Sequence, residues 1–268
     1  MAEKVGTGSI VMMVIGLVIG VAVPLLLFVF FNRQKHASPR AFFFGWLAFL
    51  IGVNILEQMF HYLVYVSPLY QVLAQNLLLY GLYGGIVAGL FEELARYLCF
   101  SRFLKKEQEN DWNALMYGAG HGGSELFNLF SMTMANNLIY AFTINSSGIA
   151  TLTEGLSGAD LEQAKATLDQ LVNTTAASFL PSFAERIFAL ILQLSLSVLV
   201  FYAVKHPQRD RKLLLLAVEL HALVDFLAVC ISGMFGTLIG EIVVGISALG
   251  VAWFAHTVWK SHQSTAQN

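Results

Sequence analysis

Seven titratable side chains lie inside apolar stretches of the sequence, in three groups. They are the group Glu92, Glu93 and Arg96, the pair His121 and Glu125, and the pair His221 and Asp225. Residues four positions apart share a helix face, so each histidine faces the acid of its own pair. Imidazole and carboxylate are the usual zinc ligands outside thiolate sites. A free carboxylate beside them can take a proton from water, so the chemistry indicated is hydrolysis, above all of an amide.

The residue types are compatible with two mechanisms of hydrolysis, one with a metal ion and one without. A bound divalent cation would polarise a carbonyl and lower the pKa of a water molecule toward about 7. Without a metal ion, a Glu–His pair could still activate water by general-base catalysis. The residue types therefore indicate water activation and leave the metal ion open.

The elements that must position these groups are membrane helices. The chain has 268 residues, of which 57% are hydrophobic and 12% are charged, and its mean hydropathy is +0.66. A soluble domain carries about 25% charged residues, so a soluble single domain is excluded. The net charge of −2 gives no basic excess for nucleic acid, and two cysteines cannot form a disulfide framework. We predict an all-α, polytopic bundle of transmembrane helices.

Seven apolar runs are long enough to cross a bilayer core, which takes about 20 residues per helix. They cover roughly 9–31, 41–65, 72–100, 112–143, 180–204, 213–232 and 235–258. With seven spans, most of the 15 Lys and Arg residues fall on one side of the membrane. The positive-inside rule then places the N-terminus outside and the C-terminus in the cytoplasm. We expect residues 1–268 to form a single integral membrane domain.

The depth of the three groups is similar. At a rise of 1.5 Å per residue, Glu92, His121 and His221 lie about 12 to 15 Å from the inner ends of their spans. Gln193 lies about 17 Å from the outer end of its span, which brings it within reach of the same level. We therefore expect acids and imidazoles from three helices to meet nearer the inner face.

The longest segment outside the spans is 144–179, which we expect on the outer side. Apolar residues recur at helical spacing over 158–173. This pattern predicts an amphipathic helix that could lie on the outer membrane surface.

Further polar side chains lie toward the outer ends of the predicted spans. They are Glu57, His61, Glu185, Arg186 and Glu241. We interpret them as an ion-pair network that holds the outer ends of the helices together. The alternative is that they line a vestibule.

Taken in order along the chain, the three groups resemble the motifs of a known superfamily. The stretches Glu92-Glu93-x-x-Arg96, Tyr117-x-x-x-His121 and His221-x-x-x-Asp225 are similar to those of the type II CAAX prenyl endopeptidases and the bacterial Abi (CPBP) proteins. One residue fewer separates the glutamates from the arginine than in the prenyl endopeptidases. The run Gly-His-Gly-Gly-Ser-Glu specifically resembles the YhfC-type intramembrane metalloproteases. The resemblance covers about 40–258.

This resemblance implies roles for individual residues. Glu92 would activate water together with His121, while His221 and Asp225 would bind a metal ion or stabilise the oxyanion. The implied catalytic residues are thus Glu92, His121 and His221. Glu93 and Arg96 would be supporting residues that form an ion pair near the end of their helix.

Zinc (Zn²⁺) is the cofactor that the resemblance and the residue types suggest. Its expected ligands are His121, Glu125, His221 and Asp225. Glu125 has no counterpart in the prenyl endopeptidases and is included because it faces His121. Gln193 is expected as a further supporting residue.

We therefore predict an intramembrane hydrolase, a metal-dependent endopeptidase that cleaves a peptide bond in or near the membrane with Glu/His-activated water. The alternatives are a membrane transporter or ion channel that uses the buried His/carboxylate cluster, and a non-catalytic membrane scaffold. The expected partners are membrane lipid and a peptide or membrane-protein substrate, without nucleic acid. The resemblance implies a location in the bacterial plasma membrane.

Overall fold

The computed structural model describes residues 4–265, and this part of the chain consists of helices and turns without a strand. Six helical stretches are long and apolar enough to cross a membrane. They are Thr7–Lys35 (α1), Pro39–Tyr65 (α2, η1 and α3), Leu77–Phe103 (α5 and η2), Ala176–Lys205 (η5 and α10), Lys212–Phe235 (α12) and Thr237–Gln263 in α13 (Thr237–Thr265). The predicted all-α, polytopic membrane fold is confirmed.

The seventh predicted span, 112–143, is helical but is not one of these six stretches. It corresponds to α6 (Trp112–Glu125), the π-helix η4 (Leu126–Ser131) and α7 (Met132–Ser147), which follow one another without a break. Polar residues along this run, including Asn113, lower its mean hydropathy. The seven-span count and the orientation derived from it stay predictions.

The chain divides into two compact units. The first unit takes the chain up to Ala22 and Leu126–Phe183, and the second takes Val23–Glu125 and the chain from Ala184 onward. In the first unit, the side-chain amide of Asn145 both accepts from the Val5 N–H and donates to its carbonyl oxygen. The helix expected over 158–173 is present there as α9 (Gly158–Asn173). Its place on the outer side of a membrane stays a prediction.

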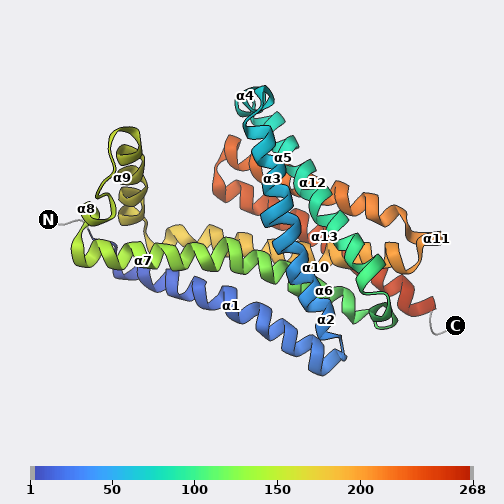
Figure 1. Ribbon diagram of the computed structural model, residues 1–268. Helices are drawn as coiled ribbons and strands as arrows, with labels where there is room; N and C mark the ends of the chain where they lie inside the picture. The colour runs from blue at the N-terminus through green and yellow to red at the C-terminus, as the bar shows by residue number, and fades with distance from the viewer. Residues whose placement is uncertain (1–3, 266–268) are drawn as a thin grey trace. The chain divides into compact units, whose positions relative to one another are not determined.

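In the second unit, three pairs of helices pack along one another. The pairs are α5 (Leu77–Leu98) with α12, α2 (Pro39–Ile51) with α6, and α12 with α13 (Figure 1). Glycines allow two of these approaches, because a Cβ at Gly85 would collide with the Ala222 carbonyl oxygen, and one at Gly120 with that of Phe42. Small residues at such contacts let membrane helices approach closely. The helices that carry Glu92, His121 and His221 belong to these pairs.

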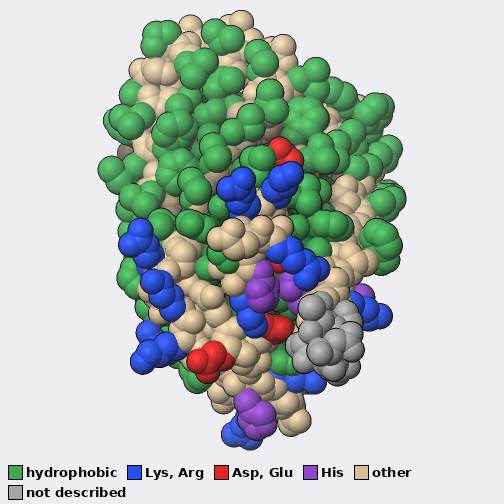
Figure 2. Space-filling model, turned by 90° about the vertical axis from the view of Figure 1, so that its right-hand side faces the viewer, with side chains coloured by type: hydrophobic (Ala, Val, Ile, Leu, Met, Phe, Trp, Pro, Cys, Tyr) green, Lys and Arg blue, Asp and Glu red, His purple; other side chains and the backbone are tan. Residues whose placement is uncertain are grey.

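Polar and apolar side chains are distributed as in a membrane protein. Large apolar side chains are exposed along the helices, among them Leu26 at 67% and Trp253 at 70%, whereas Arg96 and His121 are fully buried. Lipid can cover such an apolar surface, and charged groups inside a membrane face the protein interior. Lys, Arg and His side chains gather on the face that carries α11 (Pro207–Asp210), beside a mostly hydrophobic surface (Figure 2).

Candidate active site

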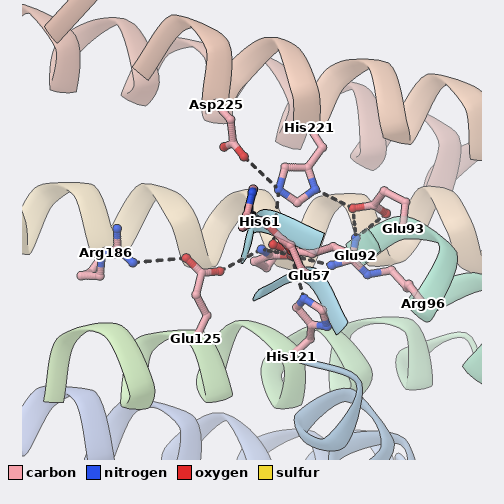
Figure 3. A network of polar contacts seen from close by, with 11 residues as sticks. Glu57, His61, Glu92, Glu93, Arg96, His121, Glu125, Arg186, His221 and Asp225 are labelled. Atoms are coloured by element: carbon pink, nitrogen blue, oxygen red, sulfur yellow. Dashed lines mark hydrogen bonds and ion pairs between the residues drawn. The ribbon is translucent and has the colours of Figure 1, made fainter. Parts of the chain in front are cut away.

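The carboxyl group of Glu92, on α5, lies at the centre of a buried polar cluster in the second unit (Figure 3). His121 on α6 places its Nε2 2.9 Å from Glu92 Oε2, and Gln193 on α10 (Leu180–Lys205) donates from Nε2 to the same oxygen at 2.9 Å. His221 on α12 places its Nε2 3.9 Å from Glu92 Oε1. A carboxylate can only accept hydrogen bonds, so His121 carries a proton on Nε2. Four helices therefore converge on this one carboxyl group.

A buried ion pair between Glu93 and Arg96 lies against the imidazole ring of His221. Arg96 donates from Nη1 to both carboxyl oxygens of Glu93 at 2.5 Å, and both side chains are fully buried. His221 Nδ1 lies 2.8 Å from Glu93 Oε1. Because this contact fixes the imidazole ring, Nε2 of His221 faces Glu92 and the carboxyl group of Asp225, 3.6 Å away. The expected Glu93–Arg96 pair is present.

Arg96 lies in the last turn of α5, which agrees with the expected position of this ion pair near a helix end. Past Leu98 the helical run continues as the π-helix η2 (Cys99–Phe103). Arg96 also donates from Nη2 to Gln193 Oε1 at 2.5 Å. The pair is therefore part of the buried cluster, where no water competes for its charges.

Glu125 joins the cluster through Gln193. Gln193 Nε2 donates to Glu125 Oε2 at 2.8 Å, and Arg186 Nη1 donates to Glu125 Oε1 at 3.2 Å. The sequence pattern placed Arg186 in a network at the outer helix ends, and it does pair with its neighbour Glu185. Its contact with Glu125 was missed. The available signal was its spacing of seven residues from Gln193, which puts both on one face of α10.

A second chain of contacts lies next to the cluster and begins at Glu57. Glu57 Oε1 is 3.2 Å from His61 Nε2 (Figure 3). His61 Nδ1 is 2.6 Å from the hydroxyl group of Tyr83. Two members of the network expected at the outer helix ends, Glu57 and His61, are thus in contact. Tyr83 is an additional member that the sequence pattern did not single out.

Three π-helices interrupt the helices that carry these residues. The segment η1 (Gly52–Glu57) ends at Glu57, η2 begins three residues after Arg96, and η4 begins directly after Glu125. Single π-turns inside α-helices occur frequently at functional sites, because each one rotates the side chains that follow it. Their positions next to the cluster favour a functional role for it.

The helices and the cluster define an integral membrane protein with a buried site of acids and histidines between its spans. The chain belongs to the YhfC intramembrane metalloprotease family, whose model matches residues 19–246. It is 35% identical over 251 residues to the "Uncharacterized membrane protein YhfC" of Bacillus subtilis (strain 168), across 91% of this chain and 95% of that protein. No solved structure matches the chain. The predicted resemblance to this family is confirmed, and the link to the CAAX endopeptidases stays a prediction.

The family description implies a metal ion, and the residues of the cluster fit one in type. Ligands on a tetrahedral zinc ion, each about 2 Å from the metal, lie about 3.3 Å from one another. Of the expected ligands, His221 and Asp225 are 3.6 Å apart, which is close to that value. The Glu93 carboxylate on His221 Nδ1 is the kind of contact that orients a metal-binding histidine.

The arrangement of these donors is nevertheless that of a hydrogen-bonded network. Within residues 4–265, no three His, Cys, Asp or Glu side chains are placed as a metal ion would require. His121 Nδ1 is buried without a hydrogen-bond partner among these residues, so this histidine lacks the second contact that His221 has. Glu125, one of the expected ligands, is held by Arg186 and Gln193.

Proposed function

We propose that the protein hydrolyses a peptide bond in or next to the membrane, with Glu92 as the general base. The observation that carries this proposal is the buried Glu92 carboxyl group, which His121, Gln193 and His221 approach from three other helices. A buried carboxyl group inside a membrane is costly and is characteristic of functional sites. Membership of the YhfC intramembrane metalloprotease family supports the same reaction class.

The two oxygens of Glu92 are suited to different tasks. Oε2 accepts from His121 and Gln193, and these two donors fix the orientation of the carboxylate. Oε1 is 3.9 Å from His221 Nε2, a gap too long for a direct hydrogen bond that a water molecule could bridge. Oε1 takes a proton from this water while the water oxygen attacks the carbonyl carbon of the substrate. The same proton then passes to the leaving amide nitrogen as the C–N bond breaks.

The histidines stabilise the charge that develops during the attack. The tetrahedral intermediate carries a negative oxygen, and preorganised N–H donors in a water-poor site stabilise such an oxygen strongly. His221 takes this role in its doubly protonated form, in which Nδ1 donates to Glu93 and the Nε2–H group faces the same space as Glu92 Oε1. Gln193 and Arg96 act as positioning residues, because they hold Glu92 and Glu93 from the opposite side.

As an alternative to these hydrogen-bonding roles, with the histidines unprotonated on the nitrogen that faces the cation, we propose His121, His221 and Asp225 as the residues that would hold a divalent cation such as zinc. When bound, the cation would polarise the substrate carbonyl and make the water more acidic. Glu125 is a weaker candidate as a ligand than the sequence pattern suggests, because Arg186 already pairs with it.

The test is hydrolysis by purified protein in liposomes, with a pool of apolar fluorophore–quencher peptides as substrate. Reaction in ¹⁸O-labelled water should place one ¹⁸O in the new carboxyl terminus of each cleaved peptide, which mass spectrometry detects. We expect Glu92→Gln to slow cleavage by about 100-fold or more, because general-base catalysis contributes about 10² to 10⁴. Glu219→Gln is the matched control, since Glu219 is an exposed acid on α12 two residues from His221. Cleavage that is equal in both variants would refute the role of Glu92.

A transporter or channel remains the competing function, and one observation favours it. Polar contacts run in an unbroken series from Arg186 through Glu125 and Gln193 to Glu92. Such a series inside a membrane can conduct protons or cations. The same liposomes loaded with a pH-sensitive dye distinguish the two functions. Proton flux that is lost in Glu92→Gln, without peptide cleavage by the wild type, would favour transport.

A further inference from the structure

A cavity of about 610 Å³ lies next to the cluster, within the second unit. Residues from η1, α3 (Gln58–Tyr65), α4 (Pro68–Ala74), α5 and α12 line it. Asp225 belongs to both places, because it lines the cavity and its carboxyl group is 3.6 Å from His221 Nε2. The cavity therefore adjoins the position at which Glu92 and His221 would act on a substrate.

The charged groups of this cavity are acidic. Glu57 and Asp225 line it, and none of its described lining residues is Lys or Arg. The Glu57 side chain is 7% exposed, and its Oε2 is buried without a hydrogen-bond partner among the described residues. A buried carboxyl oxygen without a partner is costly, so it indicates a group that is supplied from outside.

The other carboxyl oxygen of Glu57 is already satisfied. An ionised Glu57 carboxylate can only accept, so the proton of a neutral His61 imidazole is on Nε2, and Nδ1 accepts from the Tyr83 hydroxyl group at 2.6 Å. His61 Nε2 then donates to Glu57 Oε1 at 3.2 Å. This relay fixes the Glu57 carboxyl group with one oxygen engaged and the other available.

Aromatic rings form much of the remaining wall. The cavity is lined by four tyrosines, Tyr65, Tyr70, Tyr80 and Tyr83. Aromatic faces attract ammonium and guanidinium groups, and this attraction increases where water is excluded. Two carboxyl groups and four tyrosines without a basic residue form a lining that is complementary to an organic cation.

We propose that this cavity binds a lysine or arginine side chain of the substrate peptide, beside the bond that is cleaved. This inference rests on the proposed hydrolysis and names a feature of its substrate. A cationic side chain inside a membrane needs an acidic partner. Glu57 Oε2 accepts its hydrogen bond, and Asp225 marks the end nearest the cluster. Successive residues of an extended peptide are about 3.5 Å apart, so the basic residue lies within one or two positions of the scissile bond.

The experiment measures binding as well as cleavage, so that failure of this inference can be told from failure of the proposed function. The probes are two fluorescent apolar peptides that differ at one position, Arg in one and the neutral Gln in the other. Their affinity for the wild-type protein in phosphatidylglycerol nanodiscs is measured by fluorescence anisotropy. We expect the Arg peptide to bind about tenfold more tightly, the factor that a hydrogen bond to a charged group provides. Glu57→Gln should remove this preference.

Glu241→Gln is the matched control, because Glu241 is another acid with a buried carboxyl oxygen that lacks a partner, and it does not line the cavity. This variant should keep the preference for Arg. Equal affinity of the wild type for both peptides would overturn the inference, whether or not either peptide is cleaved. A preference that survives Glu57→Gln would also overturn it. A preference lost on addition of soluble phosphocholine, which leaves the charge of the membrane unchanged, would assign the cavity to a lipid ammonium group instead.

An Arg preference in binding without any cleavage would support the cavity's role and count against the proposed hydrolysis. Cleavage of both peptides at equal rates, with equal affinity, would support the proposed hydrolysis and count against the cavity's role. Tyr83→Phe provides a second variant in case Glu57→Gln fails to fold. It removes the hydroxyl group that fixes His61, so we expect it to reduce the preference without abolishing it.

Discussion

Replacing Gly120 with alanine should displace α6 from α2 and disturb the neighbouring His121. The added Cβ would lie 2.7 Å from the carbonyl carbon of Phe42 and 2.9 Å from its Cα, whereas ordinary contacts begin at 3.4 Å. The obstacle is backbone, so it cannot be relieved by a change of rotamer. The difference between 3.4 and 2.7 Å requires the helices to separate by at least about 0.7 Å, because the carbonyl oxygen of Phe42 lies closer still.

That displacement is large compared with the geometry of the site. A shift of about 0.7 Å along the contact between His121 Nε2 and Glu92 Oε2 would lengthen it from 2.9 Å to about 3.6 Å, outside hydrogen-bond range. Misplacement by about 1 Å can slow an enzyme by about 100-fold. We therefore expect Gly120→Ala to reduce peptide cleavage by about 10-fold to 100-fold. Overpacking should also lower the free energy of unfolding by about 1 to 3 kcal/mol.

The assay compares thermal unfolding in detergent and cleavage in liposomes for two alanine variants. Gly250→Ala is the control, because a Cβ at Gly250, in α13, meets nothing within 4 Å. Alanine in an open helical position stabilises by about 0.5 to 1 kcal/mol relative to glycine. The two variants should thus shift the unfolding temperature in opposite directions. An unchanged unfolding temperature and unchanged cleavage in Gly120→Ala would refute the close approach of α6 and α2.

Three other perturbations test separate parts of the cluster. Gln193→Leu removes the partner of Arg96 Nη2 and two donor contacts, so the unfolding free energy should fall by about 3 kcal/mol or more, measured by thermal unfolding. Arg186→Gln leaves Glu125, 13% exposed, without its cation, and should cost about 1 to 3 kcal/mol in the same assay, whereas no change would place this pair in solvent. Metal analysis of detergent-purified protein should find about one divalent ion per chain in the wild type and a loss in His221→Ala. A folded, active wild type without metal would contradict the proposed ligands.

The sequence contained much of the site but not its contacts. Residue types and four-residue spacing predict that His221 faces Asp225, and their side chains are 3.6 Å apart. The contact between His121 and Glu92 could not be predicted in this way, because it depends on how closely α5 and α6 come within the bundle. The same spacing rule pairs His121 with Glu125, whereas Glu125 is held by Arg186 and Gln193. A helix rotates by about 100° per residue, and the π-helices change this rotation within the helices.

The acids of the cluster outnumber its guanidinium groups. Four acids, Glu92, Glu93, Glu125 and Asp225, face two guanidinium groups, those of Arg96 and Arg186, in a part of the protein that is largely closed to water. With neutral histidines, the cluster would carry an excess of two negative charges, which is unfavourable at low dielectric. Two bound protons or one divalent cation would remove it.

Bound protons and a bound divalent cation require different protonation states of His221. A divalent cation needs the neutral imidazole with a free Nε2, and the contact of Nδ1 with Glu93 provides that tautomer. A protonated His221 would satisfy Glu93 and the carboxyl groups around Nε2 at the same time, without a metal ion. The Glu93 contact is compatible with both, so metal content decides between them. If the ion is present, Glu93→Gln should weaken its binding by about 10-fold to 100-fold, because a neutral amide replaces the charged acceptor of the Nδ1 proton.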